Sequence, residues 1–211
     1  MKKLYFLRDR EAFYRFLAKI ACLAVYQPKY IGFEQIPETG AAILISNHVS
    51  YADGLVIASG VNRPVRFIID KDIYNAPLVH YFMKYNRAIP IEPTRDSVIK
   101  ALEEVSSGLA NGDIICIFPE GQLTYTGSLG RFKTGIESMV KRNPVPVYPI
   151  ALTGLWGSMF SRKYLGSLKR WVPKKFSQKV HAICGAPIPA ELVSINRLQE
   201  TVMRLKYKVG N

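Results

Sequence analysis

The sequence predicts an α/β domain in which helices cover a largely parallel, mixed sheet. Three short β-branched runs, at 41–46, 65–69 and 113–118, are typical of strands that are buried on both faces. Segments with helical periodicity lie between them, and this alternation favours parallel strands. With 211 residues, 48% of them apolar, the chain is long enough for one buried domain, which we expect to span residues 1–211.

The N-terminal region, residues 1–30, is expected to hold an amphipathic helix. Apolar side chains recur at helical spacing from 13 to 24, and Arg15 and Lys19 lie on the other side. Such a helix packs on its own domain or lies on a membrane surface, and the sequence leaves both open. The longest apolar stretch there covers about 11 residues, so no membrane span of about 20 residues is predicted.

Two later segments complete the predicted fold. A helix is expected over 96–111, with Gly112 placed to end it. The apolar run at 145–152 is predicted to be a strand. It contains Pro146 and Pro149, which cannot donate ladder hydrogen bonds, and this favours an edge strand or a strand end.

The charge predicts attraction to phosphates. The chain has 29 Lys and Arg against 16 Asp and Glu, a net charge of +13, which suits nucleic acid, lipid head groups or small anionic substrates. Residues 162–180 combine seven cations with Trp and aliphatic side chains and contain no acid. This composition favours an anionic bilayer surface, with a merely solvated basic face as the alternative. No recognised nucleic-acid-binding module is present.

The cysteines and two of the histidines predict no metal centre. Cys22, Cys116 and Cys184 are odd in number and far apart, so they form neither a disulfide framework nor a zinc ribbon. A reducing compartment is the simplest interpretation. His80 and His181 are single residues in apolar surroundings and are expected to be structural.

His48 and Asp53 are the first candidate catalytic pair. They are five residues apart, just past the first predicted strand, where ligand sites of α/β sheets gather. If the chain turns there, the Asp53 carboxylate can accept the Nδ1 proton of His48 and leave Nε2 as a general base. Alternatively, Ser50-x-x-Asp53 is a capping box and His48 a loop residue.

A second polar segment follows the run at 113–118. A carboxylate beside a glycine, then hydroxyls and two cations, would suit a polyol phosphate: the carboxylate binds a hydroxyl or a cation, the glycine lets the backbone approach, and the cations meet phosphate. An ordinary loop is the alternative. The candidate substrate-binding residues are Glu120, Gly121, Thr124, Arg131 and Lys133.

Together the two segments resemble the signature of the glycerolipid acyltransferases related to bacterial 1-acylglycerol-3-phosphate acyltransferase. Asn47-His48-x-x-x-x-Asp53 matches the NHxxxxD block of that family, and Phe118-Pro119-Glu120-Gly121 matches its FPEG block. Further blocks have counterparts in order at 87–92, 132–135 and 145–150. The resemblance covers about residues 30 to 160.

The resemblance implies a glycerolipid-acyltransferase-like fold and a lysophospholipid O-acyltransferase. His48 would be the general base, Asp53 its orienting partner, and Asn47 part of the substrate site. The donor would be acyl carrier protein or coenzyme A carrying the acyl group as a thioester, with no separate cofactor and no metal. The family also implies a peripheral, monotopic enzyme on the cytoplasmic face of a bacterial inner membrane, in contact with anionic lipid and not with nucleic acid.

Two departures from the family pattern concern phosphate binding. Leu123 and Pro93 stand where the family carries arginines, which leaves Arg95, Arg131 or Lys133 as substitutes. The segments around them look more like the acyltransferase domain of bacterial 2-acylglycerophosphoethanolamine acyltransferase, whose phosphodiester acceptor has one charge fewer. Synthesis of phosphatidate from 1-acylglycerol 3-phosphate is the alternative reaction. A non-catalytic basic protein that binds lipid or nucleic acid is the alternative of another class.

Overall fold

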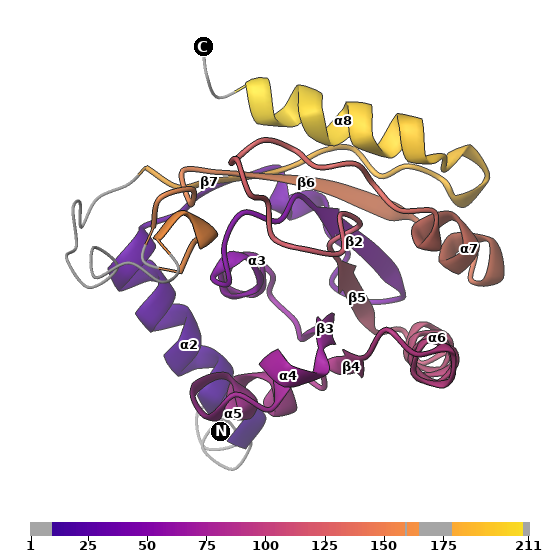
Figure 1. The fold of residues 1–211 in the computed structure, drawn as a ribbon, viewed down its shortest axis with the longest axis horizontal. Helices are drawn as coiled ribbons and strands as arrows, with labels where there is room; N and C mark the ends of the chain where they lie inside the picture. Colours follow the sequence, from indigo (N-terminus) through magenta and orange to yellow (C-terminus); the bar gives the residue numbers. More distant parts are fainter. Residues whose placement is uncertain (1–9, 159, 165–178, 209–211) are drawn as a thin grey trace.

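The computed structural model describes residues 10–158, 160–164 and 179–208. Its strands are β1 Lys29–Ile31, β2 Ala42–Ser46, β3 Val65–Asp70, β4 Ile89–Ile91, β5 Ile114–Ile117, β6 Val147–Thr153 and β7 His181–Cys184. They form one seven-stranded sheet in the order β1-β7-β6-β2-β5-β3-β4 (Figure 1). Of the described neighbours, β6 and β7 pair antiparallel and the others pair parallel. The predicted α/β fold with a largely parallel, mixed sheet is confirmed.

Helices cover both faces of this sheet (Figure 1). They are α2 Arg10–Tyr26, α3 Asp53–Gly60, α4 Lys71–Tyr74, α5 Pro77–Tyr85, α6 Arg95–Ala110, α7 Gly135–Arg142 and α8 Ile195–Tyr207, with 3-10 turns at Phe33–Gln35, Arg162–Tyr164 and Ala190–Leu192. Apolar side chains of α2 and α3 belong to one core cluster, and those of α6, α7 and α8 belong to the other.

The burial of strand β2 explains why four of its five residues are apolar. Ala42 and Leu44 face the first cluster, whereas Ile43 and Ile45 face the second, so both faces of this strand are buried. The predicted strands at 41–46, 65–69 and 113–118 correspond to β2, β3 and β5.

Strand β6 confirms one alternative predicted from its prolines and corrects the other. Pro146 directly precedes the strand, at its end, whereas the predicted edge position is wrong. The strand lies inside the sheet, between β7 and β2, and is not an edge strand. Pro149 accepts the Gly185 N–H at 2.8 Å. Gly185 lies just past the end of β7. The missing N–H of Pro149 therefore faces the end of the β6–β7 ladder. The proline therefore costs that ladder only its last bond.

The predicted helices are both present. The 96–111 helix is α6, and Gly112 follows it with a φ of 79°, which ends the helix as expected. Helix α2 covers the predicted 13–24 segment and packs through Cys22 and Tyr26. Its other face exposes a row of large apolar side chains, namely Phe13, Phe16, Leu17, Ile20, Leu23 and Val25. Among the described residues, no helix is long and apolar enough to span a bilayer.

Candidate active site

The two polar segments meet at the carboxyl ends of neighbouring parallel strands. β2 ends at Ser46, directly before Asn47 and His48, and β5 ends at Ile117, shortly before Glu120. Because β2 and β5 pair in parallel register, these ends lie at the same edge of the sheet.

The predicted pairing of His48 with Asp53 is present in the structure. Nδ1 of His48 lies 2.8 Å from Oδ2 of Asp53, which is the first residue of α3 and fully buried. The same oxygen accepts the backbone N–H groups of Val49 and Ser50, at 2.7 and 3.0 Å, and the Ser50 hydroxyl accepts the Ala52 N–H at 3.1 Å. One arm of the alternative capping box, from the Ser50 N–H to the Asp53 carboxylate, is therefore present. The other arm is not formed, because the Asp53 N–H donates to the Ser50 carbonyl and the N-cap residue of α3 is Ala52, which makes no side-chain capping bond.

This environment leaves one nitrogen of the imidazole for chemistry. With Nδ1 held by the carboxylate, Nε2 is the atom that can receive a proton from a substrate. The ring is stacked on Phe118, with centroids 4.1 Å apart, and its side chain keeps 19% exposure. Burial raises the pKa of the Asp53 carboxyl, and the three hydrogen bonds to Oδ2 oppose this increase.

Glu120 joins the histidine segment to the loop after β5. Its Oε1 accepts the backbone N–H of His48 and its Oε2 accepts that of Gly130, both at 2.7 Å. Burial raises the pKa of this carboxyl above its usual value. A Cβ at Gly130 would lie 2.4 Å from Oε2, so this close approach requires glycine. The predicted hydroxyl or cation ligand of Glu120 is replaced by backbone donors, which favours a positioning role.

The side chains of Asn47 and Thr124 also form hydrogen bonds with backbone groups. The buried Asn47 amide donates to the carbonyl of Leu152 and accepts its N–H, at 3.0 and 2.7 Å. The Thr124 hydroxyl donates to the Ser128 carbonyl at 2.8 Å, and the Thr124 N–H donates to the His48 carbonyl at 2.9 Å. The side-chain groups predicted to bind substrate are thus used to fix β6 and the loop around His48.

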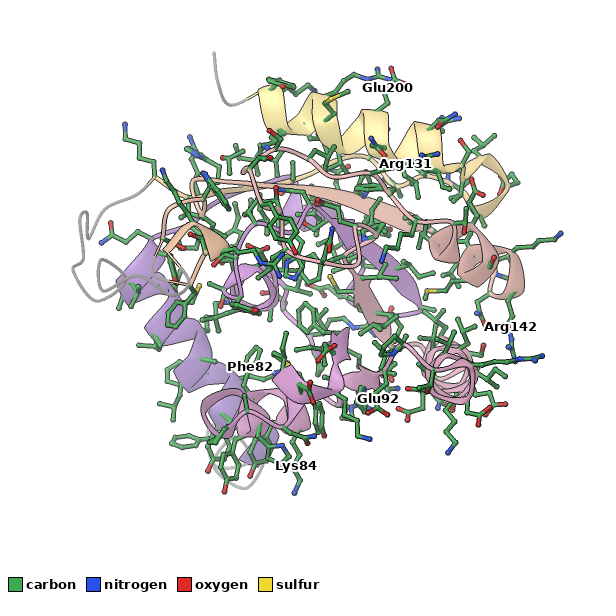
Figure 2. The ribbon with its side chains drawn as sticks, viewed as in Figure 1. Phe82, Lys84, Glu92, Arg131, Arg142 and Glu200 are labelled. Carbon is green, nitrogen blue, oxygen red and sulfur yellow. The ribbon has the colours of Figure 1, made fainter. Side chains whose placement is uncertain are left out.

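Arg131 and Lys133 line a groove of about 1450 Å³ between this loop and α8, together with Glu120. Figure 2 shows Arg131 beside α8. A Cβ at Gly121, whose φ is 67°, would lie 2.6 Å from the Lys133 ammonium, so glycine admits that cation. Arg95 is the first residue of α6, which follows the edge strand β4. Strands β5 and β3 lie between β4 and β2 in the sheet. Arg95 is not among the residues that line this groove.

Arg162 is a residue that the sequence analysis placed in the basic stretch 162–180, most of which lies outside the described residues. In the structure its guanidinium donates to the Leu123 carbonyl at 3.1 Å and lies 4.0 Å from the centroid of the Tyr125 ring. Residues 118 to 130 contain no Lys or Arg. This absence is the signal in the sequence that a cation near this loop comes from another segment of the chain.

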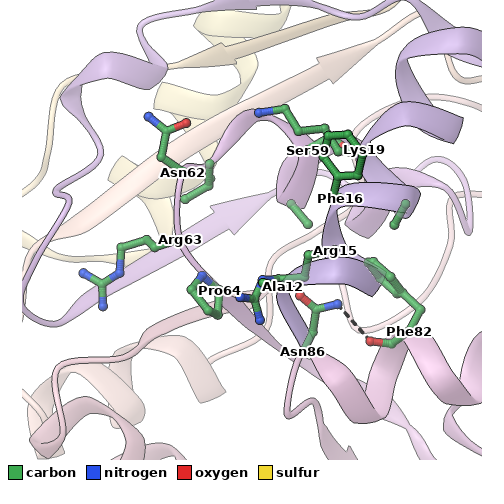
Figure 3. Close-up of a pocket in the computed structure, with 13 residues that line it drawn as sticks. Ala12, Arg15, Phe16, Lys19, Ser59, Asn62, Arg63, Pro64, Phe82 and Asn86 are labelled. Carbon is green, nitrogen blue, oxygen red and sulfur yellow. Dashed lines mark hydrogen bonds between the residues drawn. The ribbon is translucent and has the colours of Figure 1, made fainter. Parts of the chain in front are cut away.

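A second cavity, of about 270 Å³, lies between α2 and the Gly60 end of α3 (Figure 3). It is lined by Phe16 and Lys19 of α2 and by Ser59. Because Asp53 begins α3 and this cavity adjoins its other end, the cavity is separate from the histidine site.

Comparison with known proteins places these features in a family. The family model described as Acyltransferase matches residues 27–153. A chloroplastic 1-acyl-sn-glycerol-3-phosphate acyltransferase of Brassica napus is 29% identical over 157 residues, covering 72% of this chain and 45% of that protein. A probable 1-acyl-sn-glycerol-3-phosphate acyltransferase of Mycoplasma pneumoniae is 24% identical over 160 residues, covering 74% and 59%. The chain thus spans about half the length of the curated relatives it matches.

A solved structure has the same fold. The crystal structure of the 1-acyl-sn-glycerophosphate acyltransferase of Thermotoga maritima superposes with a TM-score of 0.69 at 24% sequence identity, covering 98% of this chain and 79% of that chain. This likeness supports the glycerolipid-acyltransferase-like fold expected from the motif blocks.

Proposed function

This chain belongs to the acyltransferase family, and on that premise we propose that it moves a fatty acyl group from an acyl thioester to the free hydroxyl of a lysophospholipid. The observation that carries the proposal is the His48–Asp53 hydrogen bond of 2.8 Å at the carboxyl end of β2, beside the loop fixed by Glu120. A buried carboxylate that binds one imidazole nitrogen and leaves the other accessible is an arrangement suited to general-base catalysis.

The reaction needs one proton relay and no covalent acyl-enzyme. The acceptor hydroxyl oxygen attacks the thioester carbonyl carbon while Nε2 of His48 takes the hydroxyl proton. Asp53 stabilises the imidazolium that forms. The C–S bond of the resulting tetrahedral species then breaks, and the thiolate leaves with the proton from His48.

We propose 1-acylglycerol 3-phosphate as the acceptor. The motif pattern favours a general lysophospholipid, with synthesis of phosphatidate as the alternative, and the names of the relatives favour that alternative. The net charge of +13 supports an acceptor with a phosphomonoester. A phosphodiester acceptor is the second candidate, because Leu123 and Pro93 replace two arginines of the family pattern.

The donor and the location follow from the same proposal. Acyl carrier protein or coenzyme A would deliver the acyl group, and both are anionic. The six exposed apolar side chains of α2 support peripheral contact with a membrane, and the net charge of +13 favours an anionic one. We place the protein on the cytoplasmic face of the inner membrane, without a cofactor or a nucleic-acid partner.

An acceptor panel tests the proposal. The purified chain is incubated with acyl carrier protein or coenzyme A thioesters and with three acceptors, namely the lysophospholipids 1-acylglycerol 3-phosphate and lysophosphatidylethanolamine and an uncharged monoacylglycerol. We expect phosphatidate to form fastest. Faster acylation of the phosphodiester acceptor would favour the second candidate. Lipid binding without acyl transfer from either donor would contradict the enzymatic proposal.

A further inference from the structure

We propose that Arg162 binds the phosphate of the acceptor next to His48, and so acts as a specificity-determining residue supplied from outside the loop. This inference rests on the proposed function, because it concerns the anionic head group of that acceptor. The loop itself has no cation to offer, since none of the residues from 118 to 130 is Lys or Arg. A cation for a phosphate at this place must come from another segment.

The segment after β6 brings Arg162 to the histidine turn. Ser161 and Ser50 form an antiparallel bridge, and the Tyr51 N–H donates to the Phe160 carbonyl at 3.1 Å. Arg162 therefore leaves the backbone directly beside the turn that connects His48 to α3.

Two contacts then fix the direction of the guanidinium. Nη1 donates to the Leu123 carbonyl at 3.1 Å, and the Tyr125 ring lies 4.0 Å below the central carbon. The next residue of the loop, Thr124, donates its N–H to the His48 carbonyl. Arg162 is thus tied to the histidine segment from both sides, through Ser161 and through the loop.

The geometry suits an oxyanion. A guanidinium carries five N–H donors in a plane, and the Leu123 carbonyl takes one of them. Stacking on Tyr125 leaves the edge of the plane, where the donors are, for two parallel hydrogen bonds to a phosphate. The side chain is half-buried, so it is both held and accessible.

Other cations approach the loop from the side of α8, in a groove that Tyr125 also lines. Lys133 and Arg131 line the groove against α8, and Lys206 of α8 donates to the Gly127 carbonyl at 2.9 Å. Helix α8 packs in the core cluster on one face of the sheet, whereas Val49 and Leu155 pack in the cluster on the other face. Arg162 follows Leu155 in the chain and shares the face of the histidine turn.

The test compares Arg162→Gln with Arg162→Lys and with the control Arg204→Gln, whose arginine pairs with Glu200 on the exposed side of α8. For 1-acylglycerol 3-phosphate we expect Arg162→Gln to raise KM about 10- to 100-fold, the effect of losing a charge-assisted hydrogen bond. The KM for an uncharged monoacylglycerol should stay unchanged. Arg162→Lys should recover part of the loss, and the control should match wild type.

A second pair of variants tests the stacking. Tyr125→Leu removes the ring under the guanidinium and should raise the KM for the phosphate acceptor by a smaller factor, and Tyr125→Phe, which keeps the ring, should raise it less than Tyr125→Leu does. Equal changes for charged and uncharged acceptors in Arg162→Gln would indicate a purely structural role and overturn the proposal. An unchanged KM for both acceptors would overturn it too.

A binding experiment separates this inference from the proposed reaction. Glycerol 3-phosphate is titrated into wild type and Arg162→Gln and followed by phosphorus NMR, which needs no turnover. Weaker binding to the variant than to the Arg204→Gln control supports the inference even if no acceptor is acylated. Equal affinity for all three proteins contradicts it, even if wild type proves to be an active acyltransferase.

Discussion

Asp53 performs two functions with one oxygen, because Oδ2 receives both the imidazole of His48 and the N–H groups of the turn. Asp53→Asn keeps an acceptor for the turn but removes the charge that stabilises an imidazolium. We expect turnover to fall strongly, though less than in a variant without His48, with a loss of about 1 kcal/mol in unfolding free energy. Steady-state kinetics and chemical denaturation of the same samples check both parts. Normal turnover in a destabilised variant would reduce Asp53 to a capping residue.

The environment of Glu120 predicts how the free energy of unfolding depends on pH. Burial raises the pKa of its carboxyl, so the unfolded chain loses this proton at a lower pH than the folded one. The contribution of Glu120 to stability is therefore full below the ordinary glutamate range, about 4.3, and falls as pH rises through the folded pKa. In Glu120→Gln this dependence disappears. The difference in unfolding free energy between wild type and variant should shrink from pH 5 upward in denaturation curves; a difference independent of pH would contradict the assignment.

The same variant should also lose activity at neutral pH. Glutamine offers one acceptor oxygen, whereas the carboxylate accepts from both His48 and Gly130, so one of these N–H groups faces an amide donor. The histidine segment or the loop then shifts. Glu120→Asp is the matched control: it keeps the charge but shortens the reach, and it should lose activity without losing the pH dependence.

Lys133 and Arg95 distinguish two candidate phosphate contacts named from the sequence. Lys133 lines the groove with Glu120, but Arg95 lies beyond two further strands. We expect Lys133→Gln to raise the KM for 1-acylglycerol 3-phosphate by a smaller factor than Arg162→Gln does, and Arg95→Gln to leave it unchanged. The reverse order in steady-state assays would place the head group near α6.

At the residue scale, the sequence could predict what is local. His48 and Asp53 are five residues apart, and a single turn brings them together. Asn47, Glu120 and Arg162 could not be assigned in this way, because their partners are 105, 72 and 39 residues away in the chain. Their hydrogen bonds depend on which backbone groups the sheet places nearby, and no spacing in the sequence encodes that.

At the element scale, the success of prediction followed length and burial. β2, β3 and β5 are apolar runs inside the sheet and were predicted. β1 and β4 have three residues each, too few for a pattern to separate from a loop. β7 has four residues, as β5 does, and was not predicted. Pro149 misled the prediction for β6 because the permitted position of a proline depends on where β7 ends.

Helix α2 carries the element-scale prediction. Its exposed apolar face should bind a bilayer through buried area, so replacing Phe13, Phe16 and Ile20 with Ser should weaken vesicle co-sedimentation at every salt concentration. By contrast, binding through charge is screened over about 8 Å at physiological ionic strength. The matched set replaces Lys169, Arg170, Lys174 and Lys175, which lie outside the described residues, with Gln.

The two sets separate the sources of binding. The serine variant should keep the salt sensitivity of wild type, and the glutamine variant should lose it. Binding that ignores anionic lipid and both sets of changes would refute the membrane assignment. Equally tight, salt-sensitive binding to duplex DNA would favour the nucleic-acid alternative.

At the scale of the whole molecule, the sheet explains why segments so far apart form one site. The carboxyl ends of β2, β5 and β6 are neighbours, and each is followed by a segment that contributes: the His48 turn, the Glu120 loop and the strand-to-turn segment carrying Arg162. The family match covers 27–153, so it includes the first two and ends before the third.

The most direct test of His48 as the general base compares the rate of phosphatidate formation by wild type and His48→Ala. Both proteins are first shown to be folded, and the rates are then measured with 1-acylglycerol 3-phosphate and an acyl thioester. The account predicts that wild type forms phosphatidate and that the variant loses at least about 100-fold in rate, the usual contribution of a general base. A variant whose rate stays within about threefold of wild type would contradict it, because that residue could not then be the group that takes the hydroxyl proton.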